Sequence, residues 1–512
     1  MKRLALSALA AALYAALCAA LPAQALDGKP AVDRNTLVVA LPSGPGNLDP
    51  LIPPSIDSAK FAWNSFDTLY GFDREGRLEP RLATAHQVGE GGLVHRFTLR
   101  RGVKFHNGDA FTAEDVKFSM ERVLAPETKS TRRPFFANTV ASVEAPDAQT
   151  VVFRLKQKDG AFLNKLAGYL YIVPKAYLES LKTPEAFAQA PVGTGPYRIV
   201  GHQIGRSLEF ARFDGFWGDK PAIAKLVYRF VPEPSSRVNA LLAGEADVGV
   251  EIAPADIERL ADAKGLATER VAGGSPLHIR IYSNDPATPL SRPQVRLALN
   301  YAVDKDAIIQ SVLRGQAAPL GALIPSSYPY GVDATLKPFA YDPARAKKLL
   351  AEAGLPNGFE TALTCPTTQP RAICEALAAY WGQVGIRTQI KVIDSAAYNR
   401  LNAAHQSGPL VVMGFGNAIY DPIHVVGGTV ARNGTWSDYF NPEVEALIQQ
   451  VEGESDRGRR DALFRQILRL ARDDGQAVLL AEPQLGYLRD TALQWQPQAA
   501  GWNLDFRSAR WK

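Results

Sequence analysis

The sequence predicts an α/β protein, and three observations lead to this prediction. Short β-branched and apolar runs alternate with amphipathic, helix-like segments along most of the chain. The 512 residues are enough for about three folding units. The composition is 46% hydrophobic, 21% charged and 9% aromatic, which is typical of globular proteins. We therefore expect a folded body made of several α/β domains.

Residues 1–25 have the features of a secretory signal peptide. Lys2 and Arg3 precede an apolar run over residues 4–21, and an Ala-Gln-Ala triplet ending at Ala25 offers the small side chains of a cleavage site. We predict cleavage after Ala25 and secretion of the remaining chain.

Two other interpretations of this leader stay open. Its apolar run reaches the length that spans a membrane, so an uncleaved anchor is the first. Cys18 raises the second, lipidation, although Leu17 stands before it where a lipobox has a small residue.

The two remaining cysteines, Cys365 and Cys374, stand nine residues apart. In an oxidising compartment such a pair either closes a short disulfide loop or stays as two buried thiols. The sequence leaves both outcomes open, because it does not give the distance between the two Cα atoms.

The charge balance argues against nucleic-acid binding. Lys and Arg number 57 against 52 Asp and Glu, which gives a formal net charge of +5. The densest basic spots, residues 100–101 and 132–133, are isolated arginine pairs rather than a stripe that tracks phosphates.

The first strand is predicted over residues 36–41, where a β-branched and apolar run ends at the breakers of residues 42–46. A loop that leaves a core strand commonly contacts ligands. A second strand is predicted over residues 93–99. Thr112 and Asp115 have the spacing of a capping box, so we expect a helix to begin there.

A strand over residues 150–155 is predicted to precede a helix that begins near Ala161. The proline and glycine breakers of residues 191–196 predict a crossing between domains. Strands and helices then alternate to the end of the chain. The predicted strands are residues 197–200, 208–212, 225–231, 388–393 and 409–413, and the helices are 235–243, 293–313, 343–353, 373–384, 442–451 and 457–473.

Local motifs of catalysis are missing from the sequence. No two of the seven histidines share a helical turn, which excludes a helical zinc-protease pair, and no Gly-x-Ser-x-Gly or phosphate-binding loop occurs. We therefore predict no enzyme activity, no cofactor and no metal site. A catalytic triad built from distant segments leaves no local trace, so a secreted hydrolase stays as an alternative.

Six segments, in the expected order, resemble the family 5 extracytoplasmic solute-binding proteins, the peptide- and nickel-type receptors of ABC importers. The segments are residues 78–85, 97–119, 191–197, 239–247, 295–304 and 341–354. The resemblance that they carry extends over nearly the whole chain after the leader.

The resemblance implies a two-lobed periplasmic-binding-protein clamshell, of type II or cluster C, with an extra domain in lobe one. A hinge-bending receptor of this kind binds its ligand between the lobes and performs no chemistry. The expected domains are residues 26–56, 195–277 and 487–512 for the core of lobe one, 57–194 for its extra domain, and 278–486 for lobe two.

The implied function is that of a periplasmic receptor for an ABC importer. It would capture a short or modified peptide, or a peptide-like solute, and deliver it to permease subunits at the inner membrane. We expect a monomer. The alternatives are a chelated metal such as nickel, an oligosaccharide or an opine for the same receptor role, and the secreted hydrolase from another class.

In peptide-binding relatives, an aspartate just beyond a lobe-two strand pairs with the amino group of the peptide. The matching segment here is residues 411–422, and an ungapped placement puts Ala418 at that position. An alanine leaves a buried ammonium unpaired, which disfavours a standard free-amine peptide. Asp421 either substitutes for the aspartate or serves as a turn residue before Pro422.

In nickel-binding relatives a histidine directly follows this Asp-Pro pair. Here Ile423 takes that place and His424 comes one residue later, which turns the side chain elsewhere on a regular element. His424 is therefore a candidate ligand contact or a hydrogen-bonded surface histidine.

The remaining candidate contacts come from three places in the chain. Arg132 and Arg133 have the guanidinium forks that hold carboxylates, or else are solvated loop residues. Loops beside strand ends supply the others, whose side chains would form stacking walls or polar contacts. As alternatives, the aromatic residues belong to the core and Asn47 caps a turn. These candidates are Phe415, Asn417, Tyr420 and Trp436, together with Ser43, Gly44 and Asn47.

Overall fold

The computed structural model describes residues 34–53, 55–416, 418–499 and 503–512. The predicted signal peptide, with its cleavage after Ala25, and the candidate residue Asn417 lie outside these residues. Among the helices that are described, none is both long and apolar enough to cross a membrane.

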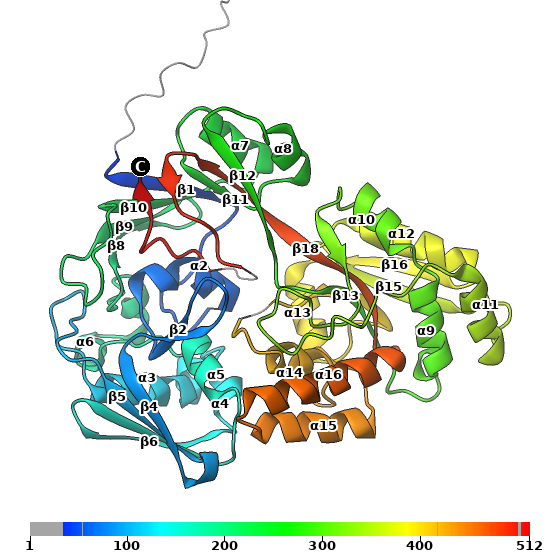
Figure 1. The fold of residues 1–512 in the computed structure, drawn as a ribbon, viewed down its shortest axis with the longest axis horizontal. Helices are drawn as coiled ribbons and strands as arrows, with labels where there is room; N and C mark the ends of the chain where they lie inside the picture. The colour runs from blue at the N-terminus through cyan, green and yellow to red at the C-terminus, as the bar shows by residue number, and fades with distance from the viewer. Residues whose placement is uncertain (1–33, 54, 417, 500–502) are drawn as a thin grey trace, which may run out of the picture.

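Two α/β bodies, which we call lobe one and lobe two, lie side by side and share the long strand β18 (Ala477–Asp490) (Figure 1). The first half of β18 pairs with β13 (Leu277–Ile281) and β14 (Ala317–Pro319) of lobe two. Its second half pairs with β11 (Val248–Val250) and β12 (Leu266–Ala272) of lobe one. One continuous strand therefore ties the sheets of the two lobes together.

Within the described residues, the chain crosses between the lobes in two places, the short segment that links β12 to β13 and the middle of β18. The domain boundaries expected after residues 277 and 486 fall close to these crossings. They stay predictions.

The central sheet of lobe one is built around the first strand. Strand β1 runs parallel to β10 and β11, and β9 and β8 continue the sheet in antiparallel pairing. Helix α2 contacts β8, helix α7 contacts β11 and β18, and helix α8 contacts β18. The bounds are β1 Thr36–Leu41, β8 Tyr197–Gln203, β9 Ser207–Arg212, β10 Lys225–Phe230, α2 Ser55–Ser65, α7 Pro234–Leu242 and α8 Pro254–Arg259.

A second sheet in lobe one is antiparallel, with strands in the order β4, β5, β7 and β6. Strand β5 alternates buried and exposed residues because one face packs on the core. Helix α3 covers this sheet, and its predicted capping box is confirmed, since the Thr112 amide donates to Asp115 Oδ2 (2.8 Å). The bounds are β4 Ala83–Gly89, β5 Val94–Leu99, β6 Val140–Asp147, β7 Thr150–Leu155 and α3 Ala113–Leu124.

Shorter elements complete lobe one. Strands β2 and β3 form a hairpin, and strands β19 and β20 pair near the end of the chain. The bounds are β2 Tyr70–Phe72, β3 Leu78–Pro80, β19 Leu493–Gln494, β20 Arg510–Trp511, α4 Arg133–Phe136, α5 Phe162–Tyr169 and α6 Lys175–Ser180, with 3-10 helices at Glu90–Gly92, Pro126–Thr128 and Pro184–Ala188.

Lobe two is a mixed sheet flanked by helices. Strands β16, β15 and β17 are parallel, and β13 joins β17 in antiparallel pairing. The bounds are β15 Glu360–Pro366, β16 Arg387–Ile393, β17 Leu410–Gly414, α9 Pro293–Tyr301, α10 Lys305–Ser311, α11 Pro343–Glu352, α12 Arg371–Gln383, α13 Ser395–Ala403, α14 Ile423–Thr429, α15 Pro442–Gly453 and α16 Arg457–Asp473, with a 3-10 helix at Pro289–Ser291.

The single helix predicted over residues 293–313 is wrong, because the chain forms α9 and α10 with a break between them. Asp304 caps α10, and its carboxylate accepts a hydrogen bond from the Ala307 amide (2.9 Å). An aspartate competes for backbone donors in this way and starts a new helix where the periodicity alone continues the old one.

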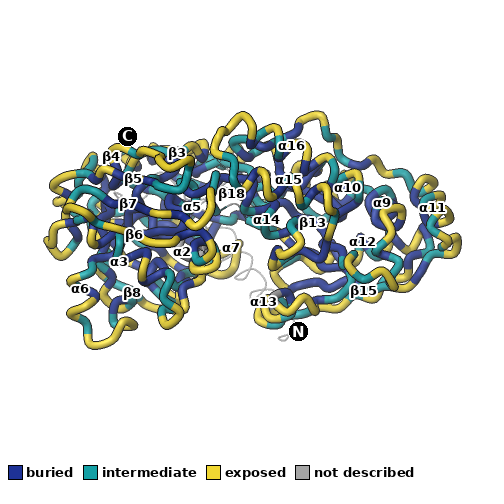
Figure 2. The backbone as a smooth tube through the Cα atoms, turned by 90° about the horizontal axis from the view of Figure 1, so that it is seen from below, coloured by how far each residue is buried: buried dark blue, intermediate teal, exposed yellow. Residues whose placement is uncertain are grey.

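The largest hydrophobic core runs without a break from lobe one into lobe two. It joins Phe97 and Phe162 of lobe one to Val425 and Phe464 of lobe two. Figures 1 and 2 show α14 on the side of lobe two that faces lobe one. The two lobes are thus in direct contact as well as tethered.

Cys365 at the end of β15 and Cys374 in α12 form a disulfide, with their Cα atoms 6.3 Å apart. Both residues are buried in the core of lobe two. The bond therefore ties a sheet strand to the helix that covers it.

We expect the double variant Cys365→Ser/Cys374→Ser to lose about 2–3 kcal/mol of unfolding free energy, because a short loop is no longer closed in the unfolded chain. Urea unfolding with and without reductant measures this loss. Reductant should destabilise the native protein and leave the double variant unchanged. Equal stability of the native protein and the double variant, both without reductant, would contradict the prediction.

Candidate binding site between the lobes

The loop between β17 and α14, which we call the site loop (residues 415–422), reaches from lobe two into lobe one. Tyr420 is its anchor. The Tyr420 ring lies 4.8 Å from that of Phe72, and its hydroxyl donates to the carbonyl oxygen of Ala499 (3.3 Å). Gly76 makes room for the ring, because a Cβ atom there would lie 2.1 Å from it.

Helix α5 of lobe one meets the same loop through close backbone approaches. Asn164 Nδ2 donates to the carbonyl oxygen of Ile419 (2.9 Å). A Cβ atom on Gly168 would lie 2.6 Å from the carbonyl oxygen of Ala418, so only glycine fits there. Just before α5, the Gly160 amide donates to the carbonyl oxygen of Glu452 at the end of α15 (2.8 Å).

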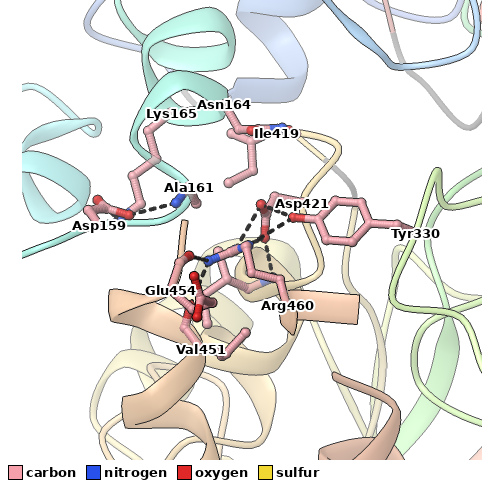
Figure 3. A network of polar contacts seen from close by, with 11 residues as sticks. Asp159, Ala161, Asn164, Lys165, Tyr330, Ile419, Asp421, Val451, Glu454 and Arg460 are labelled. Carbon is pink, nitrogen blue, oxygen red and sulfur yellow. Dashed lines mark hydrogen bonds and ion pairs between the residues drawn. The ribbon is translucent and has the colours of Figure 1, made fainter. Parts of the chain in front are cut away.

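A buried ion pair holds the site loop in place (Figure 3). Arg460 of α16 donates through Nη2 to both carboxylate oxygens of Asp421 (2.8 and 2.9 Å). The side chains are only 3% and 1% exposed. Tyr330 donates its hydroxyl hydrogen to Asp421, and the Ile423 amide donates to Asp421 Oδ1 (2.9 Å), which closes a turn just before α14. Burial, the largest single effect, would lower the pKa of Arg460, but the charges of Asp421 and Tyr330 and the hydrogen bonds with them together outweigh it and raise that pKa.

The same guanidinium extends the network to the lobe contact. Arg460 Nη1 donates to the carbonyl oxygens of Val451 (2.6 Å) and Glu454 (3.1 Å), at the end of α15. Gly160 of lobe one packs against Glu454 and Arg460. Arg460 therefore fixes both surfaces of lobe two on which lobe one rests.

A chain of rings, which we call the aromatic cluster, crosses from one lobe to the other. It consists of Phe135 and Tyr169 of lobe one with Phe415, His424 and Trp436 of lobe two. The His424 ring lies 4.9 Å from Phe415, 5.9 Å from Phe135 and 6.1 Å from Tyr169, and Phe415 lies 6.3 Å from Trp436. Buried Arg132 ends the cluster, with its guanidinium 5.6 Å from the Tyr169 ring.

His424 is neutral in this setting. Burial lowers its pKa to about 4, and the charges of Lys165 and Arg132 act in the same direction. Its Nδ1 lies 3.0 Å from the hydroxyl of Tyr169, and its ring also donates to the backbone carbonyl of Gly416. Among the described residues, no group of three or more metal-binding side chains gathers to hold a metal ion.

The structure brings four of the predicted contacts together, namely Arg132, Phe415, His424 and Trp436. Tyr420 and Asp421 share the site loop with Phe415, but Tyr420 points into lobe one and the Asp421 carboxylate is engaged by Arg460 and Tyr330.

The other predicted contacts lie elsewhere. Arg133 is exposed and donates to the carbonyl oxygen of Leu124 (2.9 Å). Ser43 is exposed, Gly44 packs against Phe230, and Asn47 accepts a hydrogen bond from the Asp49 amide (2.8 Å), which caps the turn. Asn417 lies outside the described residues.

Sequence reasoning missed Phe135, Tyr169, Tyr330 and Arg460. Phe135 stands close to Arg132 in sequence, which was the one available signal for it. Nothing in the local sequence separates Arg460 from the neighbouring arginines of α16, because only its packing against Asp421 distinguishes it.

Comparison with known proteins agrees with this two-lobed arrangement. The family model for bacterial extracellular solute-binding proteins, family 5 Middle, matches residues 77–435. The glutathione-binding protein GsiB of Pectobacterium atrosepticum is 30% identical over 463 residues, 88% of each chain. The heme-binding protein A of Haemophilus influenzae is 30% identical over 420 residues, 76% of each chain.

A solved structure is similar over almost its whole length. It is the periplasmic binding protein DppA of Helicobacter pylori in complex with the peptide STSA, with a TM-score of 0.81, 25% identity, and coverage of 93% of this chain and 98% of that one. The fold is therefore the predicted two-lobed binding-protein clamshell. The chain belongs to the family 5 bacterial extracellular solute-binding proteins, and the predicted family membership is confirmed.

We expect Arg460→Met to lower the free energy of unfolding by about 3–5 kcal/mol, because it leaves the Asp421 carboxylate buried without its counter-charge. Urea unfolding measures the loss. The double variant Asp421→Asn/Arg460→Met should regain part of it. The matched control is Arg459→Met, whose exposed ion pair with Glu454 is worth about 0–1 kcal/mol. A loss at Arg460 no larger than that of the control would contradict the prediction.

His424 predicts a defined dependence of stability on pH. Its folded-state pKa of about 4 lies below the ordinary 6.5, so the unfolded chain binds more protons between these values. The stabilisation is complete above pH 6.5 and is lost as the pH falls towards 4. We expect His424→Gln to make the unfolding free energy less dependent on pH over this window. The change in slope should correspond to at most about one bound proton. Urea unfolding at a series of pH values measures it, and an unchanged slope would refute it.

Proposed function

We propose that this protein is a periplasmic receptor that captures a short or modified peptide, or a peptide-like solute, between its lobes and delivers it to the permease of an ABC importer. The leader directs the chain to the periplasm and is cleaved after Ala25, the receptor is a monomer, and it carries out no covalent step. The lobes correspond to the expected domains, with boundaries near residues 277 and 486.

The observation that carries the ligand class is the charge pattern at the lobe contact. A buried arginine, Arg132, ends the aromatic cluster. The two positions considered for an amine-pairing carboxylate are Ala418, which has none, and Asp421, whose carboxylate is already bound by Arg460 and Tyr330. A site with a cation, aromatic walls and no available carboxylate at these positions favours a solute with a carboxylate and apolar groups.

The relatives support this class. One is named for glutathione, a modified peptide, and a solved neighbour holds the peptide STSA. The missing aspartate and this charge pattern both fit a peptide-like solute whose amino group is modified or does not bind at the site loop.

A second candidate is a metal chelate or heme, because a relative is named for heme and His424 lies among aromatic rings. The same receptor role holds. The His424 ring is already hydrogen-bonded to Tyr169 and Gly416, so any such ligand would stack on the cluster rather than bind its metal to this histidine.

The deciding experiment is native mass spectrometry of the protein purified from its own periplasm without refolding, followed by denaturing mass analysis of the released ligand. An intact peptide or peptide-like solute supports the proposal. Release of a metal complex or heme would support the second candidate instead. Recovery of the ligand only as hydrolysis products would support a secreted hydrolase. If the protein emerges empty, a thermal-shift panel of glutathione, dipeptides and hemin decides, since ligand at 100 times Kd adds about 2.7 kcal/mol.

Arg132→Gln should weaken the binding of a carboxylate-bearing ligand at least tenfold, because a charge-assisted hydrogen bond is lost. Calorimetric titration with the free acid and with its C-terminal amide measures this. The amide should bind the native protein weakly, and its affinity should be the same for the Arg132→Gln variant. The matched control is its exposed neighbour, Arg133→Gln, with unchanged affinity. Equal losses in both variants would refute the role of Arg132.

A further inference from the structure

Two cavities in lobe one meet at a ridge of arginines. The larger, of about 760 Å³, lies between the β2–β3 hairpin, the end of β18 and the last part of the chain. The smaller, of about 560 Å³, extends to residues 216–222. We call them together the arginine groove. Its ridge is formed by the residues that line both cavities, Glu79, Arg81, Arg507, Ser508 and Arg510.

The arginine groove lies outside the aromatic cluster and touches the site loop only through Phe72, which lines the larger cavity and packs against Tyr420. Its described lining residues come from residues 72–100, 216–222, 267 and 489–512. None of them belongs to lobe two, and none belongs to the aromatic cluster. A ligand bound in this groove therefore rests on lobe one alone.

Positive charge dominates the lining. Between residues 72 and 510, the described lining includes seven cationic side chains and four anionic ones. The cationic residues are Arg74, Arg81, Arg100, Lys220, Arg489, Arg507 and Arg510, and the anionic residues are Asp73, Glu79, Asp219 and Asp505. A concave surface lined with one sign of charge attracts ligands of the opposite sign.

The centre of the ridge holds two guanidinium groups that repel each other. Burial and the neighbouring charge of Arg507 lower the pKa of Arg81. Each also pairs with a carboxylate, Arg81 with Glu79 (2.5 Å) and Arg507 with Asp505 (2.8 Å). Burial would lower the pKa of Arg507, but the charges of Asp505 and Asp67 and the hydrogen bond with Asp505 together raise it. Nη1 of Arg507 is buried with no hydrogen-bond partner. An additional anion in the groove would relieve the repulsion between the two guanidinium groups.

The guanidinium groups are held in place before any ligand arrives. Arg507 Nη2 donates to the carbonyl oxygen of Trp63 (3.1 Å), and Arg510 Nε donates to Gln494 Oε1 (2.6 Å). Arg100 donates to the carbonyl oxygen of Arg81 (3.2 Å) and stacks over the Trp217 ring at 4.4 Å. Groups fixed in this way lose little freedom on binding, so their attraction is available as affinity.

We propose that the arginine groove is a second binding site of this protein, which takes a ligand with at least two carboxylate or phosphate groups. Guanidinium forks on the ridge bind one oxyanion group, and the cationic walls of the two cavities bind the next. The two sources of such groups are a small free oxyanion and the acidic side chains of a peptide segment.

Isothermal titration of the secreted protein with inorganic pyrophosphate, and separately with acetylated pentaglutamate, tests the proposal. At least one probe should bind with saturable one-to-one stoichiometry, and the affinity should fall with added NaCl. Arg510→Gln and Ser508→Asp change exposed residues of the ridge and should weaken that binding at least fivefold. The matched control is Arg206→Gln, an exposed arginine of the same lobe outside the groove, with less than a twofold effect.

The outcomes separate the sources and the sites. Binding of pyrophosphate assigns the groove to a free oxyanion, and binding of pentaglutamate alone assigns it to an acidic segment; either supports the proposal. The interlobe variant Phe415→Ala should leave the affinity unchanged. Absence of binding by both probes, equal affinity in the ridge variants and the control, or loss of binding in Phe415→Ala would overturn the proposal without touching the proposed transport function.

Discussion

The buried pair of Arg460 and Asp421 is the interaction on which the lobe contact depends. A buried charge must be paired to be stable, and here Nη2 of Arg460 reaches both carboxylate oxygens of Asp421. The other donors are also satisfied, because Nη1 donates to backbone carbonyls and Nε donates to the Tyr330 hydroxyl. A single guanidinium thereby fixes the site loop and the end of α15 as one unit. Tyr420 and the carbonyl of Ile419 face lobe one in a defined position because of it.

The contact itself is made largely by the backbone. Glycines at 76, 160 and 168 let the chains approach closely, and carbonyls of Ile419 and Glu452 accept the hydrogen bonds. Each such bond contributes about 0.5–1.5 kcal/mol to the contact between the lobes. The binding energy of a solute can exceed a contribution of this size or add to it. Together with the continuous strand β18, this arrangement suits a receptor whose lobes move about a fixed connection.

Much of the local structure was predictable from the sequence. Strands β1 and β7 and helix α16 have the predicted bounds, because their hydrophobic patterns and flanking breakers are local signals. The break between α9 and α10 was missed, since the Asp304 cap competes with a periodicity that continues across it. The site was predictable only in part. Phe415 lies in the segment matched to the ligand loop of relatives (residues 411–422) and His424 comes just after it, whereas no motif singled out their lobe-one partners Phe135 and Tyr169.

The sequence by itself determined the α/β class, the family and the loops that supply candidate contacts, because these rest on patterns within short segments. Only the tertiary structure decided that Asp421 is occupied by Arg460, that Tyr420 anchors in lobe one, and that Arg81 meets Arg507 from opposite ends of the chain. The physical reason is that burial, charge pairing and cavities arise between segments far apart in sequence, and no local pattern specifies which distant side chain completes them.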